Sequence, residues 1–257
     1  MSHPDGESFL SHLVELRDRL LRSVAAILVC FLVLWFWPGL STLYDLLARP
    51  MLHTLPEGTR MIATGVITPF VVPLKVGLMS AFLCALPYVL YQAWAFIAPG
   101  LYRHERRLAL PVVVGSTLLF LAGMAYCYFI VFGWVFRFIA EFAPKSITPA
   151  PDIEAYLSFV LTMFIAFGVT FEVPLLQIVL VRTGVVAISK LVEARPYVIV
   201  GAFVVAAVVT PPDVISQLLL AIPLCLLYEF GIVLARTLQK LFPVGERGAD
   251  EGVDAGR

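Results

Sequence analysis

The sequence predicts an all-α, polytopic membrane protein with six transmembrane helices, and three observations indicate it. Of its 257 residues, 60% are hydrophobic and only 14% are charged, with a mean hydropathy of +0.93. Soluble globular chains are nearer half apolar and a quarter charged. Six apolar segments have about the length that crosses a bilayer, and they are too continuous for the alternating strands of a membrane barrel. Helices remain, because lipid offers no partner to the backbone polar groups.

The six predicted spans follow one another with short connections. They cover residues 23–38, 70–97, 108–140, 155–181, 196–211 and 214–235. The third is longer than a bilayer requires, so its end is expected to stand clear of the membrane. The fifth rises only about 24 Å, less than the roughly 30 Å of a hydrocarbon core, which predicts a thinned bilayer or a lopsided position on that side.

Prolines interrupt four of the spans. They are Pro73, Pro87, Pro111, Pro174 and Pro223. Each removes a backbone donor and tends to kink its helix. The sequence therefore predicts bent helices that curve into a concave bundle.

The basic residues of the loops lie mostly on one side of the predicted membrane. They precede the first span, separate the second from the third and the fourth from the fifth, and follow the sixth: Arg17, Arg19, Arg22, Arg103, Arg106, Arg107, Arg182, Lys190, Arg195, Arg236, Lys240, Arg247 and Arg257. The opposite loops hold only Arg49, Arg60 and Lys145. Because Lys and Arg favour cytoplasmic loops, both termini are predicted to be cytoplasmic.

The ends of the chain differ from the spans in composition. Residues 5–22 carry apolar side chains at helical spacing and are predicted to form an amphipathic helix against the cytoplasmic surface. Asp5 and Glu7 stand where a cleavable signal would be basic, so the first apolar run is expected to stay in the membrane. Residues 1–242 are predicted to form one transmembrane domain, and the Gly-rich, charged tail 243–257 to be disordered.

Glu172 is an intramembrane carboxyl group, in the middle of the fourth span and before Pro174. Burying such a group costs several kcal/mol unless it is paired, hydrated or protonated. Two interpretations stay open: a carboxyl hydrogen-bonded to a neighbouring helix that holds the bundle together, or the polar lining of a wet cavity open to one leaflet. Gln217 is a second, weaker candidate for bonding across helices.

Two carboxylates on the cytoplasmic side lie among basic residues. Glu15 is near Arg17 and Arg19, and Glu105 lies between His104 and Arg106. Such pairs at a surface contribute about 0–1 kcal/mol. A cationic ligand is the alternative, because guanidinium groups form bidentate bonds with carboxylates.

Neither a metal site nor a catalytic motif is predicted. Cys30, Cys84, Cys127 and Cys225 fall in apolar stretches without metal-ligand spacing, and no disulfide or cofactor is expected. The four histidines all lie outside the spans, which contain neither a Gly-x-Ser-x-Gly nor a His-Glu-x-x-His motif. The sequence therefore excludes an intramembrane protease, and no enzyme is expected.

The order of several long motifs resembles the TatC family, the polytopic receptor of twin-arginine protein translocation. The resemblance covers roughly Ser11 to Phe242, and its motifs are His12-Leu-Val-Glu15-Leu-Arg17-Asp-Arg19-Leu20, Pro50, Met61-Ile-Ala-Thr64 with Pro69-Phe70, Tyr91-Gln92-Ala-Trp94-Ala-Phe96 continuing to Arg107, Phe171-Glu172-Val-Pro174, Arg195-Pro196-Tyr197, and Thr210 to Gln217 followed by Pro223, Tyr228 and Glu229. It implies a protein of the bacterial plasma (inner) membrane that binds twin-arginine signal peptides of folded precursors. It also implies assembly with single-span TatA and TatB type partners and with further copies of itself, and export driven by the proton-motive force.

The resemblance also implies roles for single residues. Glu15, Arg17, Phe96 and Glu105 match the positions that contact the twin-arginine motif. Glu172 resembles the family's intramembrane carboxylate on the concave face, Asp213 and Gln217 fall where partner helices are engaged, and Pro50 resembles a position that shapes the outer cap. A secondary transporter with Glu172 as proton carrier is the alternative, against which the lack of an internal repeat counts.

Overall fold

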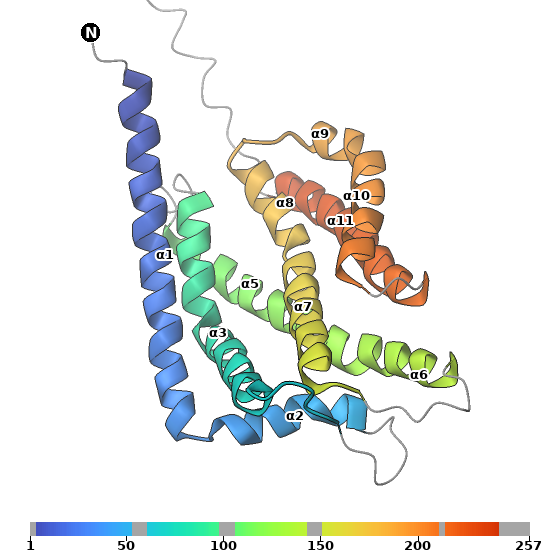
Figure 1. Cartoon of the computed structure of the whole chain (residues 1–257). Helices are drawn as coiled ribbons and strands as arrows, with labels where there is room; N and C mark the ends of the chain where they lie inside the picture. The colour runs from blue at the N-terminus through green and yellow to red at the C-terminus, as the bar shows by residue number, and fades with distance from the viewer. Residues whose placement is uncertain (1–3, 53–60, 98–105, 143–150, 211–213, 242–257) are drawn as a thin grey trace, which may run out of the picture.

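The computed structural model describes residues 4–52, 61–97, 106–142, 151–210 and 214–241, which are almost entirely helical (Figure 1). The helices are α1 (Pro4–Phe36), α2 (Leu40–Leu52), α3 (Thr68–Ile97), α5 (Arg106–Tyr126), a π-helical turn (Cys127–Val131), α6 (Phe132–Phe142), α7 (Ile153–Phe171), α8 (Val173–Arg182), α9 (Ile188–Glu193), α10 (Arg195–Val209) and α11 (Val214–Leu241). Within those ranges the sole β-type pairing is an isolated bridge between Ile62 and Asp152. The predicted all-α class is confirmed.

Five segments are long and apolar enough to cross a membrane. They are His12–Phe36, Thr68–Ile97, Leu110–Ile139, Ile153–Arg182 and Val214–Lys240, and they correspond to the first four predicted spans and the sixth. The fifth predicted span is α10, which has 15 residues and therefore rises about 22 Å, short of the roughly 30 Å hydrocarbon core. Its crossing, and with it the count of six, stays a prediction.

The predicted amphipathic helix 5–22 is not a separate element. It forms the first half of α1, whose 33 residues make a single rod (Figure 1). Between Glu7 and Phe36 the chain contains neither Gly nor Pro, so nothing in the sequence breaks the helix where the span begins. The segment thus continues without a break into the first span, and its position at the membrane surface stays a prediction.

Helix α2 lies at the opposite end of the bundle from the start of α1 and was not anticipated (Figure 1). Two tyrosine hydroxyls attach it to the spans: Tyr128 donates to the carbonyl of Leu46 at 3.2 Å, and Tyr156 to that of Leu47 at 2.8 Å. The carbonyl of Leu46 has no N–H partner within α2, because Pro50 stands four residues later, and the Tyr128 hydroxyl satisfies it. Figure 1 shows α2 crossing beneath α3.

Asp152 organises the start of α7 at this same end. Its Oδ1 accepts from the backbone N–H groups of Glu154 and Ala155, each at 2.9 Å, which is a helix N-cap. Its Oδ2 accepts from the hydroxyl and the N–H of Thr64, at 2.7 and 3.1 Å. Next to it, Lys75 pairs with Glu154 at 2.8 Å. The segment before α3 is therefore held against α7 by polar contacts.

The fourth span is broken at Glu172. α7 ends at Phe171 and α8 begins at Val173, with Pro174 in the first turn of α8, where its missing N–H costs least. Pro73, Pro87, Pro111 and Pro223 lie inside helices. The third span carries a second irregularity that the sequence did not predict, the π-helical turn Cys127–Val131.

Glycines let α5 and α7 approach closely. A Cβ at Gly123 of α5 would lie 2.5 Å from the carbonyl oxygen of Phe167, and one at Gly168 of α7 would lie 2.4 Å from the ring of Phe120. Lipid is as apolar as the side chains, so helices associate in it by close packing, for which small residues are suited. The main apolar cluster, which includes Phe120, Phe132 and Phe167, fills the space around this crossing.

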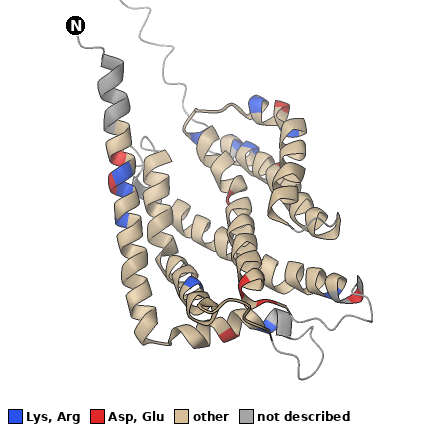
Figure 2. Ribbon diagram, in the orientation of Figure 1, with Lys and Arg blue, Asp and Glu red and all other residues tan. Residues whose placement is uncertain are grey.

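Charged residues gather at the two ends of the bundle (Figure 2). The end that carries the first half of α1 also carries α9 and the start of α10, and its basic residues are those of the predicted cytoplasmic loops. Between the ends, Glu172 lies at the junction of α7 and α8. The distribution agrees with a cytoplasmic N-terminus.

Replacing Gly123 by Ala is expected to destabilise the protein by about 1–3 kcal/mol, because the new methyl group meets backbone atoms of α7 that cannot give way. The thermal midpoint of the purified protein in detergent measures the effect. Gly115→Ala is the matched control: it lies on the same helix with nothing within 4 Å of its Cβ position. Equal midpoints for the two variants would contradict the close approach.

Removing the Asp152 carboxylate is expected to weaken, in a pH-dependent way, the attachment of the segment before α3 to the start of α7. The hydroxyl of Thr64, followed by the N–H of Ala155, holds the pKa of Asp152 at about 2, below its usual value. A lowered folded-state pKa stabilises the folded protein above the unfolded pKa of about 3.9, and this contribution is lost as the pH falls through about 2.

The thermal midpoint of the wild-type protein should therefore exceed that of Asp152→Asn by a constant amount at pH 5 to 7. The difference should shrink as the pH is lowered from about 4 towards 2. A difference that stays constant down to the lowest of these values would show that the ionised carboxylate does not matter.

Candidate functional site

The first candidate site lies at the end of the bundle that carries the predicted cytoplasmic basic residues. There the first half of α1 contacts the last turns of α3. The imidazole of His12 stacks on the ring of Phe96, with centroids 4.4 Å apart and an interplanar angle of 19°. A hydrogen bond also joins the two helices here: Nη1 of Arg19 donates to Oε1 of the buried Gln92 at 3.3 Å. His12, Glu15 and Arg19 share a helical face, so the carboxylate of Glu15 lies between the two contacts with α3.

Within the described part of the chain, Glu15 bonds through one of its two carboxylate oxygens. Nε and Nη2 of Arg19 both donate to Oε1, at 3.0 and 2.6 Å. Among the described residues, Oε2 has no hydrogen-bond partner, and 42% of the side chain is exposed. A carboxylate offers about four lone-pair positions, so Glu15 retains capacity for a second guanidinium group.

Arg17 is not brought to this face. Two residues along an α-helix correspond to a rotation of about 200°, so Arg17 projects from the other side of α1. There its guanidinium pairs with Asp18 at 2.9 Å and is 66% exposed. Glu105 lies outside the described residues, in the connection between α3, near whose end Phe96 stands, and the start of α5.

Glu172 is held from two neighbouring helices. The hydroxyl of Ser116 on α5 donates to Oε2 of Glu172. The indole N–H of Trp94 on α3 donates to the same hydroxyl oxygen at 2.9 Å. Oε1 of Glu172 is buried and has no partner among the described residues. The structure thus supports the hydrogen-bonded interpretation for one oxygen and leaves the other available.

Sequence reasoning missed Trp94, Ser116 and Gln92 as site residues. The signal for Ser116 and Gln92 was a polar side chain inside or at the end of an apolar span, both fully or nearly fully buried here. For Trp94 the signal was its indole N–H, which needs a hydrogen-bond acceptor when the ring is buried. What the sequence lacked was the pairing of helices, since Ser116 and Glu172 are 56 residues apart.

The candidate partner residues lie elsewhere. Nε2 of Gln217 donates to the backbone carbonyl of Phe203 at 3.2 Å, which joins α11 to α10. Asp213 lies outside the described residues. Pro50 stands in the last turn of α2.

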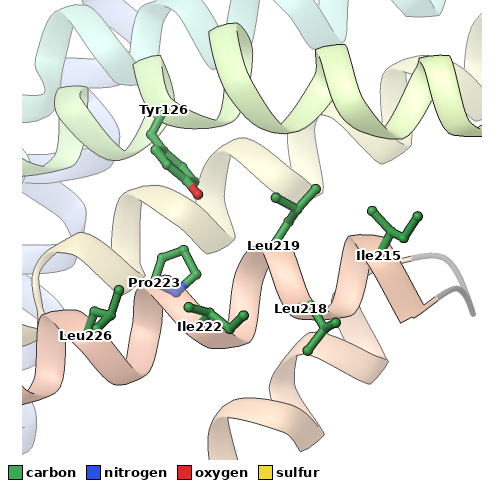
Figure 3. Close-up of a pocket in the computed structure, with 7 residues that line it drawn as sticks. All are labelled: Tyr126, Ile215, Leu218, Leu219, Ile222, Pro223 and Leu226. Atoms are coloured by element: carbon green, nitrogen blue, oxygen red, sulfur yellow. The ribbon is translucent and has the colours of Figure 1, made fainter.

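A groove of about 320 Å³ opens between α5 and α11. Figure 3 shows Tyr126 reaching into it from α5 towards α11, with its hydroxyl at the tip. The remaining lining is aliphatic and comes from α11: Ile215, Leu218, Leu219, Ile222, Pro223 and Leu226. The ring of Tyr126 packs on the rings of Phe167 and Phe171, with centroids 5.6 and 5.8 Å away. Phe171 is the residue before Glu172 in the sequence. The groove is thus an apolar recess between α5 and α11, with one polar group, the hydroxyl of Tyr126.

No metal centre is found in the described part of the chain, where His, Cys, Asp and Glu form no group of three or more able to hold an ion. The four cysteines are free thiols on spanning helices. The chemistry available at both sites is therefore hydrogen bonding and ion pairing.

Comparison with known proteins decides the family. The family model described as Sec-independent protein translocase protein (TatC) matches residues 11–223. The chain belongs to the TatC family. The Sec-independent protein translocase protein TatC of Azotobacter chroococcum mcd 1 is 50% identical over 234 residues, which are 90% of this chain and 91% of that protein. The protein of the same name from Escherichia coli (strain K12) is 48% identical over 236 residues, 92% of this chain and 91% of its own.

Solved structures agree with the sequence relatives. A crystal structure described as the twin arginine translocase receptor TatC superimposes with a TM-score of 0.76 at 38% identity, over 88% of this chain and 98% of that one. A second structure, of the same receptor in DDM, gives a TM-score of 0.77 at 38% identity, over 87% and 99% of the two chains. This member of the TatC family is thus a multi-pass component of the Sec-independent protein translocase in the bacterial plasma membrane, a transport subunit and not an enzyme.

Proposed function

We propose that this subunit reads the twin-arginine signal, and that Glu15 takes one of the two guanidinium groups. The observation that carries the proposal is the second oxygen of Glu15, which is free of partners within the described chain while Arg19 occupies the first. A guanidinium that binds there forms charge-assisted bonds next to the ring of Phe96. Arg19 already shows that this carboxylate accepts a forked donor.

Glu105 is proposed as the partner of the second arginine. It belongs to the connection that follows Phe96 along the chain, so the two carboxylates come from different elements. Lys fits such sites poorly, because an ammonium group lacks the planar fork of Arg. Arg17 would repel the signal's arginines, so its proposed contact is with carbonyl or hydroxyl groups of the signal on the other face of α1.

Partner helices of the TatA and TatB type are proposed to dock beside α10. Gln217 keeps an amide oxygen for such a partner while its Nε2 bonds to Phe203. Helix α10 exposes Val200, Val204 and Val208, a stripe at helical spacing. Asp213 immediately precedes α11 in the sequence and is proposed to take part in this docking, and Pro50 is proposed to shape the outer cap through α2. Export of folded precursors would then proceed in a complex with these partners and further copies of this chain, driven by the proton-motive force.

Glu172 is proposed to act after docking. It lies on the spanning helix formed by α7 and α8, whereas the docking site is built from α1 and α3. A buried carboxyl oxygen that has no partner among the described residues costs several kcal/mol when the group is ionised, and a polar group that meets it during transport would recover this cost.

Glu15→Gln is expected to weaken binding of a twin-arginine signal peptide by 10-fold or more, since a charge-assisted bond contributes about 1.5–3 kcal/mol. Binding is measured by photocrosslinking and by titration of the inserted protein, with Arg-Arg and Lys-Lys forms of the peptide. Glu105→Ala should have a similar effect. Asp18→Asn, which removes a carboxylate from the other face of α1, is the matched control and should bind normally. Normal binding by Glu15→Gln would refute the assignment.

Glu172→Ala is expected to leave peptide binding intact and to lower the rate of precursor export, because it removes a group away from the docking site. Binding is followed as above and export by precursor uptake into inverted membrane vesicles. Loss of binding together with export would instead place Glu172 in the docking site or show that it holds the fold.

A further inference from the structure

We propose that Trp94 and Ser116 are positioning residues that fix the carboxyl group of Glu172 and couple its orientation to the end of α3 that carries the docking site. The inference rests on the proposed function in taking α1 and α3 as the docking site and Glu172 as an element of transport. It goes beyond that function by assigning the residues through which the docking site acts on Glu172.

The direction of the hydrogen bonds follows from the donor inventory. An indole nitrogen only donates, so the Trp94–Ser116 bond places the proton of Trp94 on the Ser116 oxygen. The single proton of the Ser116 hydroxyl is then left for Oε2 of Glu172. Oε2 is thus the acceptor whenever Glu172 is ionised. Whichever group meets Glu172 in the membrane meets it at Oε1, the oxygen that is buried and unpartnered in the described structure.

Burial makes this arrangement stiff. Ser116 is fully buried and Trp94 is 4% exposed, so neither side chain exchanges its partner for bulk solvent. Trp94 also packs in a small apolar cluster with Val179 of α8, just beyond the break at Glu172. The Trp94 side chain is therefore fixed both by its N–H and by the helix that follows Glu172.

The end of α3 faces two ways. Gln92 and Phe96 contact Arg19 and His12 of α1. Trp94 stands between them in sequence, about 200° around the helix from either, and faces Ser116 of α5. Binding of a peptide against α1 and Phe96 can shift or rotate this last turn of α3 only by moving Trp94, and hence the donor that orders Ser116.

A stability role alone is the competing explanation, and the chain offers a control for it. Thr117, the next residue on α5, donates its hydroxyl to the carbonyl of Val113 in its own helix and does not touch Glu172. Thr117→Ala removes a hydroxyl at the same depth without altering the relay. Ser116→Thr keeps a hydroxyl at the relay position and tests rescue.

The experiment measures export, peptide binding and the isotope-edited infrared band of the Glu172 carboxyl group in inserted protein. Ser116→Ala should lower export by about 5-fold or more, the equivalent of one hydrogen bond, with binding unchanged. Ser116→Thr and Thr117→Ala should export normally. In a Glu172→Ala background, Ser116→Ala should cause no further loss. Normal export by Ser116→Ala, or an equal additional loss in that background, would overturn the positioning role.

The infrared band separates this inference from the proposed function. It should shift in Ser116→Ala and in Trp94→Phe but not in Thr117→Ala, even if Glu172→Ala exports normally and the transport role of Glu172 fails. Adding a twin-arginine peptide should shift the band in the wild type and not in Trp94→Phe. A band that ignores the peptide in the wild type, while the peptide binds, would refute the coupling.

Discussion

The structure depends on one constraint: within hydrocarbon, every backbone group and every polar side chain must find its partner inside the protein. Helices satisfy the backbone groups. Because no hydrophobic effect drives helices together in lipid, close crossings such as that of Gly123 against Phe167 hold them by tight packing. Side chains meet the constraint locally, as Thr117 does, or across helices, as Ser116 does. Within the described residues, Glu172 meets this constraint with one of its two carboxyl oxygens, and this is why the second oxygen invites a functional explanation.

Helix α3 connects the parts of the molecule that this constraint separates. At the outer end its Lys75 pairs with Glu154 of α7. At the basic end Gln92 and Phe96 contact α1, and Trp94 contacts α5. Under the proposed coupling, α3 is the element that the docking site and the Glu172 site have in common. The groove at Tyr126 lies between α5 and α11.

Much of the fold was accessible from composition and hydropathy. Five of the predicted spans correspond to helices of spanning length, and the break at Glu172 and Pro174 occurs where the proline indicated it. Helix α2 was missed because it is not long enough to span, and the π-helical turn at Cys127–Val131 because no residue type marks it. Residues 5–22 were expected as an element of their own, but nothing interrupts the α-helix before Phe36, so they form the first half of α1.

Within the candidate sites, the sequence by itself determined the residue types: carboxylates among arginines at the basic end, and one acidic side chain inside a span. Local order sufficed for these, since charge, hydropathy and helical spacing are properties of neighbouring residues. Only the tertiary structure decided that Arg19 occupies one oxygen of Glu15, that Arg17 faces away, and that Ser116 and Trp94 hold Glu172. These contacts join residues on different helices or depend on rotation about a helix axis, and the packing of helices sets both.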